Sequence, residues 1–185
     1  MHTLYHISKI TGIKVLKPQI STHKKAYVYA TDDLVTGLLF GAPHDDFDFI
    51  ISEESGIPAI YECYQNAFDI VFCEKSCSVY EVSDEGFERG KTSWDKEFVC
   101  ENDVPVMNEI FIGSLYSHLL SEESAGNLLI HRFENTDMYK KMISEHIVDR
   151  LIRFNVLDGE INEKIQYHYG EIITSLKNIM DGHLL

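Results

Sequence analysis

Residues 26–40, AYVYATDDLVTGLLF, constrain the fold of this chain more than any other stretch. The segment begins with residues that favour β-strands and end at Tyr29, and apolar residues at helical spacing follow. The Thr31 hydroxyl can cap this helix, and the two aspartates after it suit the positive end of the helix dipole. The stretch therefore predicts a strand that passes directly into a short helix ending at Phe40. Tyr29 then stands at a strand end, either as a stacking surface for a planar ligand or as part of a buried corner.

The composition excludes several classes of protein. The chain has 185 residues, with 44% hydrophobic and 11% aromatic residues, which suits one domain or a domain with an appendage and disfavours disorder. The net charge of −14 disfavours binding to nucleic acid, since that binding depends on Lys and Arg contacts to phosphates. The sequence contains no run of about 18 apolar residues, as a membrane span needs, and residues 1–9 do not resemble a signal peptide. We therefore expect a cytoplasmic protein without a membrane span.

Neither the cysteines nor the acidic residues predict a metal site. The four cysteines form no paired CxxC units, and the spacing of Cys73 and Cys77 alone is a weak metal signal, so we expect reduced thiols. His44 and three aspartates gather in residues 41–56, but they lack the DxDxDG spacing and the bidentate Glu of a calcium loop. We interpret this segment as a solvated acidic loop with aromatic anchors, and we expect no metal.

Strand patterns dominate residues 1–112. The expected strands lie at 3–7, 27–29, 57–64, 67–74, 77–83, 94–99 and 107–113, and a tight turn at Gln65-Asn66 joins the third to the fourth. Residues 8–16 predict a short helix or an irregular turn that Lys17-Pro18 ends, and residues 19–25 predict a polar connector.

The last third of the chain changes to helical patterns. Leu115, Leu119 and Leu120 share a helical face, and residues 138–154 and 161–180 have apolar positions three and four apart. We therefore expect an α+β core at residues 1–112 and a helical C-terminal extension at residues 113–185. These helices are expected to pack on the core, and they can mediate self-association.

Three polar residues stand inside apolar strand patterns: His6, Tyr29 and Glu97. A polar group in such a place must find a hydrogen-bond partner or line a site. Each residue also has an ordinary explanation of its own, as a core histidine, a core aromatic residue and an edge carboxylate that faces water.

Each of the three residues stands in a short sequence motif, and the three motifs follow one another along the chain. The first reads Leu4-Tyr5-His6-Ile7-Ser8, the second reads Val28-Tyr29-Ala30-Thr31 with Phe40 eleven residues after Tyr29, and the third reads Glu97-Phe98-Val99-Cys100 followed by Val104-Pro105-Val106. This order resembles the ADP-ribosyltransferase-like superfamily, in the branch with a His-Tyr-Glu triad that includes diphtheria toxin and the poly(ADP-ribose) polymerases. The resemblance covers residues 3 to about 112 and implies an α+β fold with a split antiparallel β-sheet core.

The resemblance implies that NAD is the substrate and assigns a role to each residue. His6 would hydrogen-bond the ribose hydroxyls beside the nicotinamide, and Ser8 would contact the other ribose. Tyr29 and Phe40 would sandwich the nicotinamide ring. Glu97 would bind the 2′-hydroxyl and stabilise the positive charge that develops when the glycosidic bond breaks.

The sequence departs from the family pattern at two places. Ile7 stands where the family usually has Gly, and its β-branched side chain narrows the expected pocket. Asp95 stands two residues before Glu97, where arginine-directed members have Glu or Gln, so the acceptor class stays open. If the register differs, other carboxylates can take the acidic role: Glu101, Glu109 and, more remotely, Glu62.

These observations lead to three hypotheses about function. The first is ADP-ribosyl transfer or NAD hydrolysis, with a small molecule or a basic protein favoured as acceptor by the negative charge. Within the same fold, the RNA 2′-phosphotransferase branch ranks lower, since it uses Arg on a phosphate and Arg89 is the first Arg here. The second is a catalytically silent fold that binds a nucleotide or a protein, which Ile7 favours. The third is an unrelated α+β domain in which His6, Tyr29 and Glu97 lie scattered.

Overall fold

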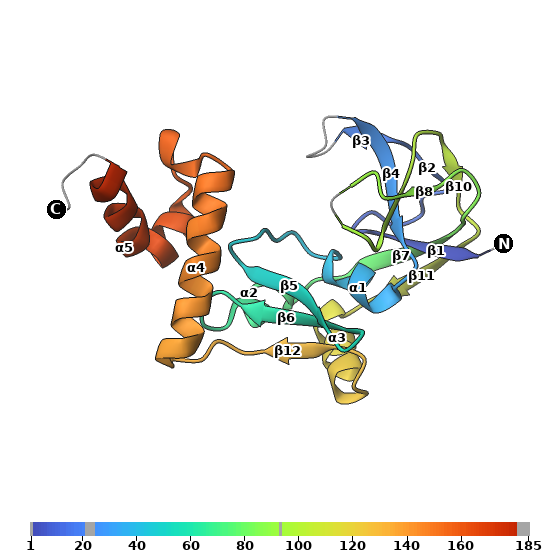
Figure 1. The fold of residues 1–185 in the computed structure, drawn as a ribbon. Coiled ribbons are helices and arrows are strands. Elements are labelled where there is room, and N and C mark those ends of the chain that lie inside the picture. The colour runs from blue at the N-terminus through green and yellow to red at the C-terminus, as the bar shows by residue number, and fades with distance from the viewer. Residues whose placement is uncertain (1, 21–24, 93, 181–185) are drawn as a thin grey trace. The chain divides into compact units, whose positions relative to one another are not determined.

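The computed structural model describes residues 2–20, 25–92 and 94–180 and shows a mixed fold with five α-helices and antiparallel β-sheets (Figure 1). Within these residues, every helix is too short or too polar to cross a bilayer. The chain forms two compact units. The first comprises residues 1–43, 54–58 and 69–129, and the second comprises residues 44–53, 59–68 and 130–185. Each unit is described separately.

The first unit contains a seven-stranded antiparallel sheet with the order β11-β7-β1-β4-β9-β8, in which β3 also pairs with β4. The strands are β1 Thr3–Ser8, β3 Gln19–Ile20, β4 Ala26–Thr31, β7 Cys77–Ser83, β8 Glu88–Arg89, β9 Glu97–Cys100 and β11 Asn108–Ile112. A small second sheet pairs β2 Val15–Leu16 with β10 Val104–Pro105, and the helices are α1 Leu34–Leu39 and α3 Leu115–Ser124.

The core of this unit lies against the central strands of the large sheet. The cluster combines apolar side chains from β1, β4, β7 and β9 with β2 and β10: Leu4, Leu16, Val28, Ala30, Tyr80, Val82, Cys100 and Val104. Tyr80 is fully buried, and its hydroxyl donates to the carbonyl of Ile10 at 2.7 Å. Strands far apart in the sequence therefore share one core.

The predicted passage from strand to helix is confirmed, but its cap differs from the expected one. Asp33 caps α1, because its side chain accepts from the Thr36 N–H at 3.1 Å. The Thr31 hydroxyl instead accepts from the Asp33 N–H at 3.1 Å and shapes the turn before the helix. Phe40 stands at the C-terminal cap of the helix.

The second unit combines a three-stranded sheet with the C-terminal helices. The sheet has the order β12-β6-β5, with strands β5 Phe49–Glu54, β6 Ile57–Glu62 and β12 Leu129–His131, and the tip of the β5–β6 hairpin groups with the first unit. The helices are α4 Asp137–Arg153, the 3₁₀ turn η1 Val156–Asp158 and α5 Glu163–Met180. The predicted amphipathic pattern of α4 is confirmed, since the buried residues lie four apart: Tyr139, Ile143, Ile147 and Leu151.

Several segments differ from the sequence predictions. Residues 67–72 form helix α2 Ala67–Phe72 rather than a strand, and the segment interpreted as an acidic loop contains strand β5. The division at residue 112 also differs from the compact units, because α3 groups with the large sheet and most of β5 groups with the C-terminal helices. Packing of those helices on the large sheet stays a prediction. All four cysteines are free thiols in the structure.

Candidate functional site

A cavity of about 190 Å³ lies over three neighbouring strands of the large sheet. Strands β1, β4 and β9 and helix α1 supply most of its lining, which comprises Tyr5, His6, Ile7, Tyr29, Ala30, Thr31, Gly37, Phe40, Trp94 and Glu97. The three residues singled out from the sequence, His6, Tyr29 and Glu97, thus share one cavity and are not scattered. Phe40, the predicted second stacking residue, lines the same cavity.

The sheet register places Tyr29 and Glu97 on one face. Glu97 of β9 is the cross-strand partner of Thr31 in β4. Tyr29 lies two residues before Thr31 in the same strand, and residues two apart along a strand point to the same side. A carboxylate and a phenol ring therefore project together toward the cavity.

His6 is held in one tautomer by the backbone of the neighbouring strand. Its Nδ1 lies 2.7 Å from the carbonyl oxygen of Tyr29, and a carbonyl only accepts, so Nδ1 carries the proton. Burial lowers the pKa of His6 below its ordinary 6.5, and the bond to Tyr29 opposes this only in part. The imidazole is therefore neutral at neutral pH, and its Nε2 is a hydrogen-bond acceptor.

Aromatic rings form much of the cavity wall. The rings of Phe40 and Trp94 lie 5.2 Å apart and are tilted by 53°, and Phe40 is 49% exposed. The ring of Tyr29 contacts that of Tyr27 edge to face at 5.9 Å. Trp94, three residues before Glu97, was interpreted from the sequence only as the start of a strand, although its place beside Glu97 was a usable signal. The wall suits a flat, apolar-faced group.

Ile7 and Gly37 fit together at the base of the cavity. A Cβ atom added at Gly37 would lie 2.6 Å from Cδ1 of Ile7 and 3.0 Å from Cγ2 of Thr31. Helix α1 can therefore approach β1 and β4 this closely only because residue 37 has no side chain. The bulk of Ile7, the departure noted in the sequence, is accommodated by a glycine in the helix opposite.

Two ion pairs fix the turn between β4 and α1. Asp33 accepts from Lys96 at 2.8 Å, and Asp32 accepts from Arg89 at 2.6 Å. Burial alone would raise the pKa of Asp33, but bonds from Lys96 and Thr36 outweigh it and lower the pKa below its ordinary value. Because Lys96 directly precedes Glu97, the first pair joins the helix cap to the strand that carries the carboxylate.

The other predicted site residues lie elsewhere. Ser8 is not among the lining residues, and its hydroxyl accepts from the Ile10 N–H at 3.1 Å. Glu101 pairs with Lys25 at 2.5 Å, and Glu62 in the second unit accepts from the Phe68 N–H at 2.7 Å.

Glu109 has a structural role in the first unit. Its carboxylate accepts from the Gly12 N–H at 2.9 Å and from the Ser78 hydroxyl at 2.8 Å, and at 3.0 Å it shares the Tyr80 hydroxyl proton with the Ile10 carbonyl. The bond from the Gly12 backbone is the main reason that the pKa of Glu109 lies below its ordinary value. Of the four acidic candidates, all of which the structure describes, Glu97 is the one that lines the cavity.

The acidic residues at 45–48 contact protein cations. Lys164 donates to Asp45 and to Asp48, each at 2.9 Å, and Arg150 forms an ion pair with Asp46. In the part of the chain that the structure describes, no group of three or more His, Cys, Asp or Glu side chains is arranged to hold a metal ion.

Comparison of the chain with protein-family models, with curated proteins and with solved structures finds no match. The chemical capacity of the cavity therefore rests on its own residues. It combines aromatic walls for a planar ring, a neutral imidazole that accepts a hydrogen bond, and one carboxylate. A carboxylate in such surroundings stabilises a positive charge that develops on a bound group.

Proposed function

We propose that this chain cleaves the nicotinamide glycosidic bond of NAD and passes the ADP-ribosyl group to an acceptor or to water. The proposal includes an ADP-ribosyltransferase-like core of the His-Tyr-Glu branch. The observation that carries it is the convergence of His6, Tyr29 and Glu97, from three neighbouring strands, on one cavity.

Each lining residue has a role that its surroundings support. The Nε2 atom of His6 accepts a hydrogen bond from a ribose hydroxyl, since its Nδ1–H is already bound to the Tyr29 carbonyl. Tyr29 and Phe40 contact the faces of the nicotinamide ring. Glu97 binds the 2′-hydroxyl and stabilises the oxocarbenium charge as the bond between the anomeric carbon and the nicotinamide nitrogen breaks. The rest of the rate enhancement comes from positioning.

The size of the cavity supports a ring-sized occupant. Pockets that take a whole drug-sized ligand measure about 300–1,000 Å³, and this one measures about 190 Å³. We infer that the nicotinamide end of NAD enters the cavity and that the adenosine end lies outside it.

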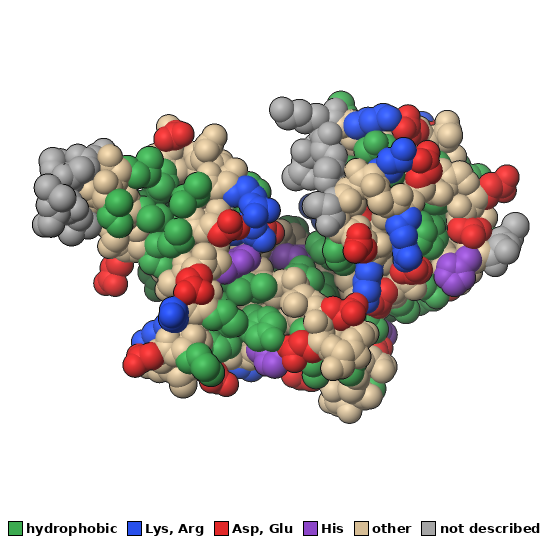
Figure 2. All heavy atoms as spheres, viewed as in Figure 1, with side chains coloured by type: hydrophobic (Ala, Val, Ile, Leu, Met, Phe, Trp, Pro, Cys, Tyr) green, Lys and Arg blue, Asp and Glu red, His purple; other side chains and the backbone are tan. Residues whose placement is uncertain are grey.

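The charge of the chain supports a small-molecule or basic acceptor over nucleic acid. The net charge is −14, and Figure 2 shows Lys and Arg side chains in small groups among acidic ones on the face in view. Binding to a phosphate backbone needs a continuous basic surface.

The alternative function is a catalytically silent fold that binds a nucleotide or a protein. Ile7 favours it, because a β-branched side chain stands in the cavity where the family has Gly. The two functions differ in a simple observable: a silent protein binds NAD and leaves it intact.

The test is nicotinamide release from NAD by the full chain, by Glu97→Ala and by Glu97→Gln. Glu101→Gln is the matched control, because Glu101 follows the same strand and pairs with Lys25 outside the cavity. We expect release by the native chain and by the control, and a loss of about 100-fold or more in both Glu97 variants, as for removal of one charge-stabilising group.

Three results would change the conclusion. Equal release by the native chain and both Glu97 variants would contradict the role of Glu97. Binding of NAD without release would favour the silent fold. Neither binding nor release would contradict NAD cleavage and would leave protein binding as the function of a silent fold.

A further inference from the structure

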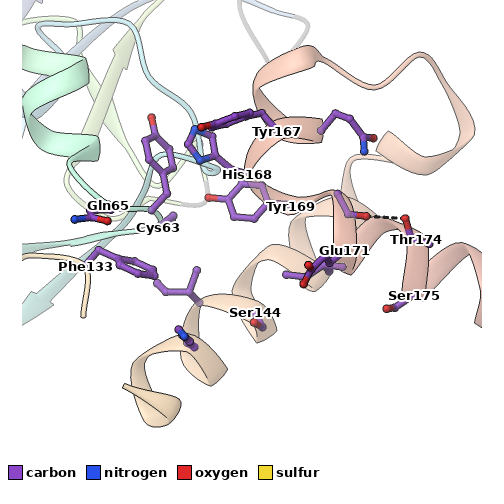
Figure 3. Close-up of a pocket in the computed structure, with 16 residues that line it drawn as sticks. Cys63, Gln65, Phe133, Ser144, Tyr167, His168, Tyr169, Glu171, Thr174 and Ser175 are labelled. Carbon is purple, nitrogen blue, oxygen red and sulfur yellow. Dashed lines mark hydrogen bonds between the residues drawn. The ribbon is translucent and has the colours of Figure 1, made fainter. Parts of the chain in front are cut away.

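The second compact unit holds a larger cavity, of about 950 Å³, to which the proposed function assigns no role. Four segments line it: residues 63–65 directly after β6, Phe133 between β12 and α4, residues 140–144 in the first half of α4, and residues 166–175 of α5 (Figure 3). Its volume lies within the range of about 300–1,000 Å³ that is typical of small-molecule sites. Space is therefore available for a ligand much larger than a single ring.

Aromatic rings gather at one end of this cavity. The rings of Tyr64 and His168 are stacked, with centroids 3.7 Å apart and planes 17° apart. Tyr167 meets His168 edge to face at 4.8 Å and 87°, and Tyr167 is 84% exposed. Figure 3 shows Tyr167, His168 and Tyr169 together near Gln65 and Cys63. Tyr167 thus presents a broad ring surface to a planar ligand.

Hydrogen bonds hold the Tyr64 and Tyr169 side chains in place before any ligand binds. The Tyr64 hydroxyl donates to Asp48 at 2.8 Å, and the Tyr169 hydroxyl donates to the Phe47 carbonyl at 2.6 Å. Tyr169 also departs from helical geometry, with φ −128° and ψ 16°, so α5 kinks within the cavity lining. A wall whose side chains are already ordered loses little entropy on binding, which favours affinity.

The remaining lining is rich in neutral hydrogen-bonding groups. Ser144 projects from α4, and Thr174 and Ser175 line the cavity from α5 (Figure 3). Gln65 and Gln166 add two amides. The Thr174 hydroxyl donates to the Gly170 carbonyl at 2.8 Å and keeps its oxygen as an acceptor. Hydroxyls and amides both donate and accept, so this lining suits a ligand with several hydroxyl groups.

The charges around the cavity balance. Lys140 and Glu171 are its two charged lining residues, of opposite sign, and the lining includes no Arg. Lys164 lies in α5, as Glu171 does, and it forms ion pairs with Asp45 and Asp48. A phosphate needs convergent cations or a bidentate guanidinium. The lining therefore favours an uncharged ligand over a nucleotide.

We propose that the cavity lined by residues 63–65, α4 and α5 binds an uncharged nucleoside, with its base stacked on Tyr167 and its ribose hydroxyls toward Ser144, Thr174 and Ser175. This site is independent of the NAD site, and each can exist without the other.

The test is calorimetric titration of the full chain with adenosine, guanosine, cytidine and uridine in turn. Tyr167→Ala is the diagnostic variant, because a side chain that is 84% exposed can be removed without opening a core. Phe154→Ala is the matched control, since Phe154 is an aromatic residue of the same unit, 53% exposed and outside the cavity lining. We expect saturable binding of at least one nucleoside, weakened about tenfold by Tyr167→Ala, as for the loss of one base–aromatic stack, and unchanged in the control.

A second titration locates the bound nucleoside. Glu97→Ala alters the smaller cavity and is expected to leave nucleoside binding unchanged. In proton NMR spectra of the native chain, the imidazole signals of His168 are expected to shift when the nucleoside is added. The His168→Gln variant assigns these signals. The proposal is overturned if no nucleoside binds at millimolar concentration. It is also overturned if Tyr167→Ala binds as well as the native chain, or if the 5′-monophosphate binds more tightly than its nucleoside.

Discussion

The chemistry of His6 depends on its surroundings. Its Nε2 accepts a hydrogen bond only while the ring is neutral, and burial keeps the pKa below the ordinary 6.5. The folded protein therefore takes up this proton less readily than the unfolded chain does. Neutral His6 contributes its full stabilisation above pH 6.5, the pKa of an ordinary histidine. This contribution is lost as the pH falls through the pKa of His6 in the folded protein, which is lower.

The first prediction is the pH dependence of nicotinamide release. Release is expected to fall as the pH drops, with a midpoint below pH 6.5, because the protonated ring no longer accepts a hydrogen bond from a ribose hydroxyl. The measurement is the initial rate against pH at NAD concentrations well below the KM, because this rate reports the ionisation of the free enzyme. His118→Gln is the control, because His118 of α3 faces Glu122 outside the cavity, and its profile should match that of the native chain. A midpoint above 6.5 would contradict a buried, neutral His6.

At the level of single elements, the start of α1 couples helix stability to the site. Asp33 caps the helix and binds Lys96, whereas its neighbour Asp32 makes a more exposed pair with Arg89. The second prediction is that Asp33→Ala lowers the free energy of unfolding by about 1 kcal/mol, as for loss of a helix cap. Asp32→Ala is expected to cost less, since exposed ion pairs contribute about 0–1 kcal/mol. Urea unfolding of the two variants measures both free energies of unfolding. An equal loss in the two variants would contradict the role of Asp33 as the helix cap.

The contact between α1 and β1 gives the third prediction. A glycine-to-alanine change within a helix normally stabilises by up to about 1 kcal/mol, but a Cβ at residue 37 would lie 2.6 Å from Cδ1 of Ile7. Gly37→Ala is therefore expected to destabilise the protein by about 1 kcal/mol, because overpacking outweighs helix propensity. Ile7→Val removes the clashing methyl, so the double variant should recover most of the loss. A double-mutant cycle measures this coupling, and strictly additive effects would contradict the contact.

The elements that the sequence predicted correctly are those with a repeated pattern. Helices α4 and α5 repeat their apolar positions over many turns, and β1 and β4 alternate or end at a clear turn signal. Helix α2 was mistaken for a strand because a six-residue apolar run fits either structure. Its burial shows the helical pattern only after folding, since Ala67, Phe68, Val71 and Phe72 are buried whereas Asp69 and Ile70 face solvent.

The candidate site was predictable where residue type and order carried the signal. His6, Tyr29, Phe40 and Glu97 were all named from sequence motifs, and all line one cavity. The fit of Ile7 against Gly37 left no local trace, because it joins residues thirty positions apart through tertiary packing. The choice of Glu97 over Glu109 likewise needed the fold, since both carboxylates stand in strand patterns and only the hydrogen bonds of Glu109 reveal its structural role.

At the scale of the whole molecule, the chain is organised as two compact units with separate polar anchors. In the second unit, buried Asp48 accepts from Tyr64 at 2.8 Å and from Lys164 at 2.9 Å, so one carboxylate joins residues 44–53, 59–68 and α5. Burial alone would raise the pKa of Asp48, but the bonds from Lys164, the Asp45 N–H and Tyr64 outweigh it and lower the pKa below 3.8. Asp48 therefore contributes its full stabilisation above pH 3.8. This contribution is lost as the pH falls through the pKa of Asp48 in the folded protein, which is lower.

The fourth prediction follows from this anchor. Asp48→Ala should destabilise the second unit by about 3 kcal/mol, because it removes one partner of a largely buried ion pair and leaves the Tyr64 hydroxyl without its acceptor. Hydrogen exchange measured by mass spectrometry should then show faster exchange in α5 and in residues 44–53 and 59–68, with little change in β1, β4 and β9. Asp46→Ala is the matched control, since the Asp46 side chain is 48% exposed and its ion pair with Arg150 contributes little. Equal acceleration in β1, β4 and β9 would mean that the two units unfold as one cooperative structure, because local opening is confined to the segments that lose their contacts.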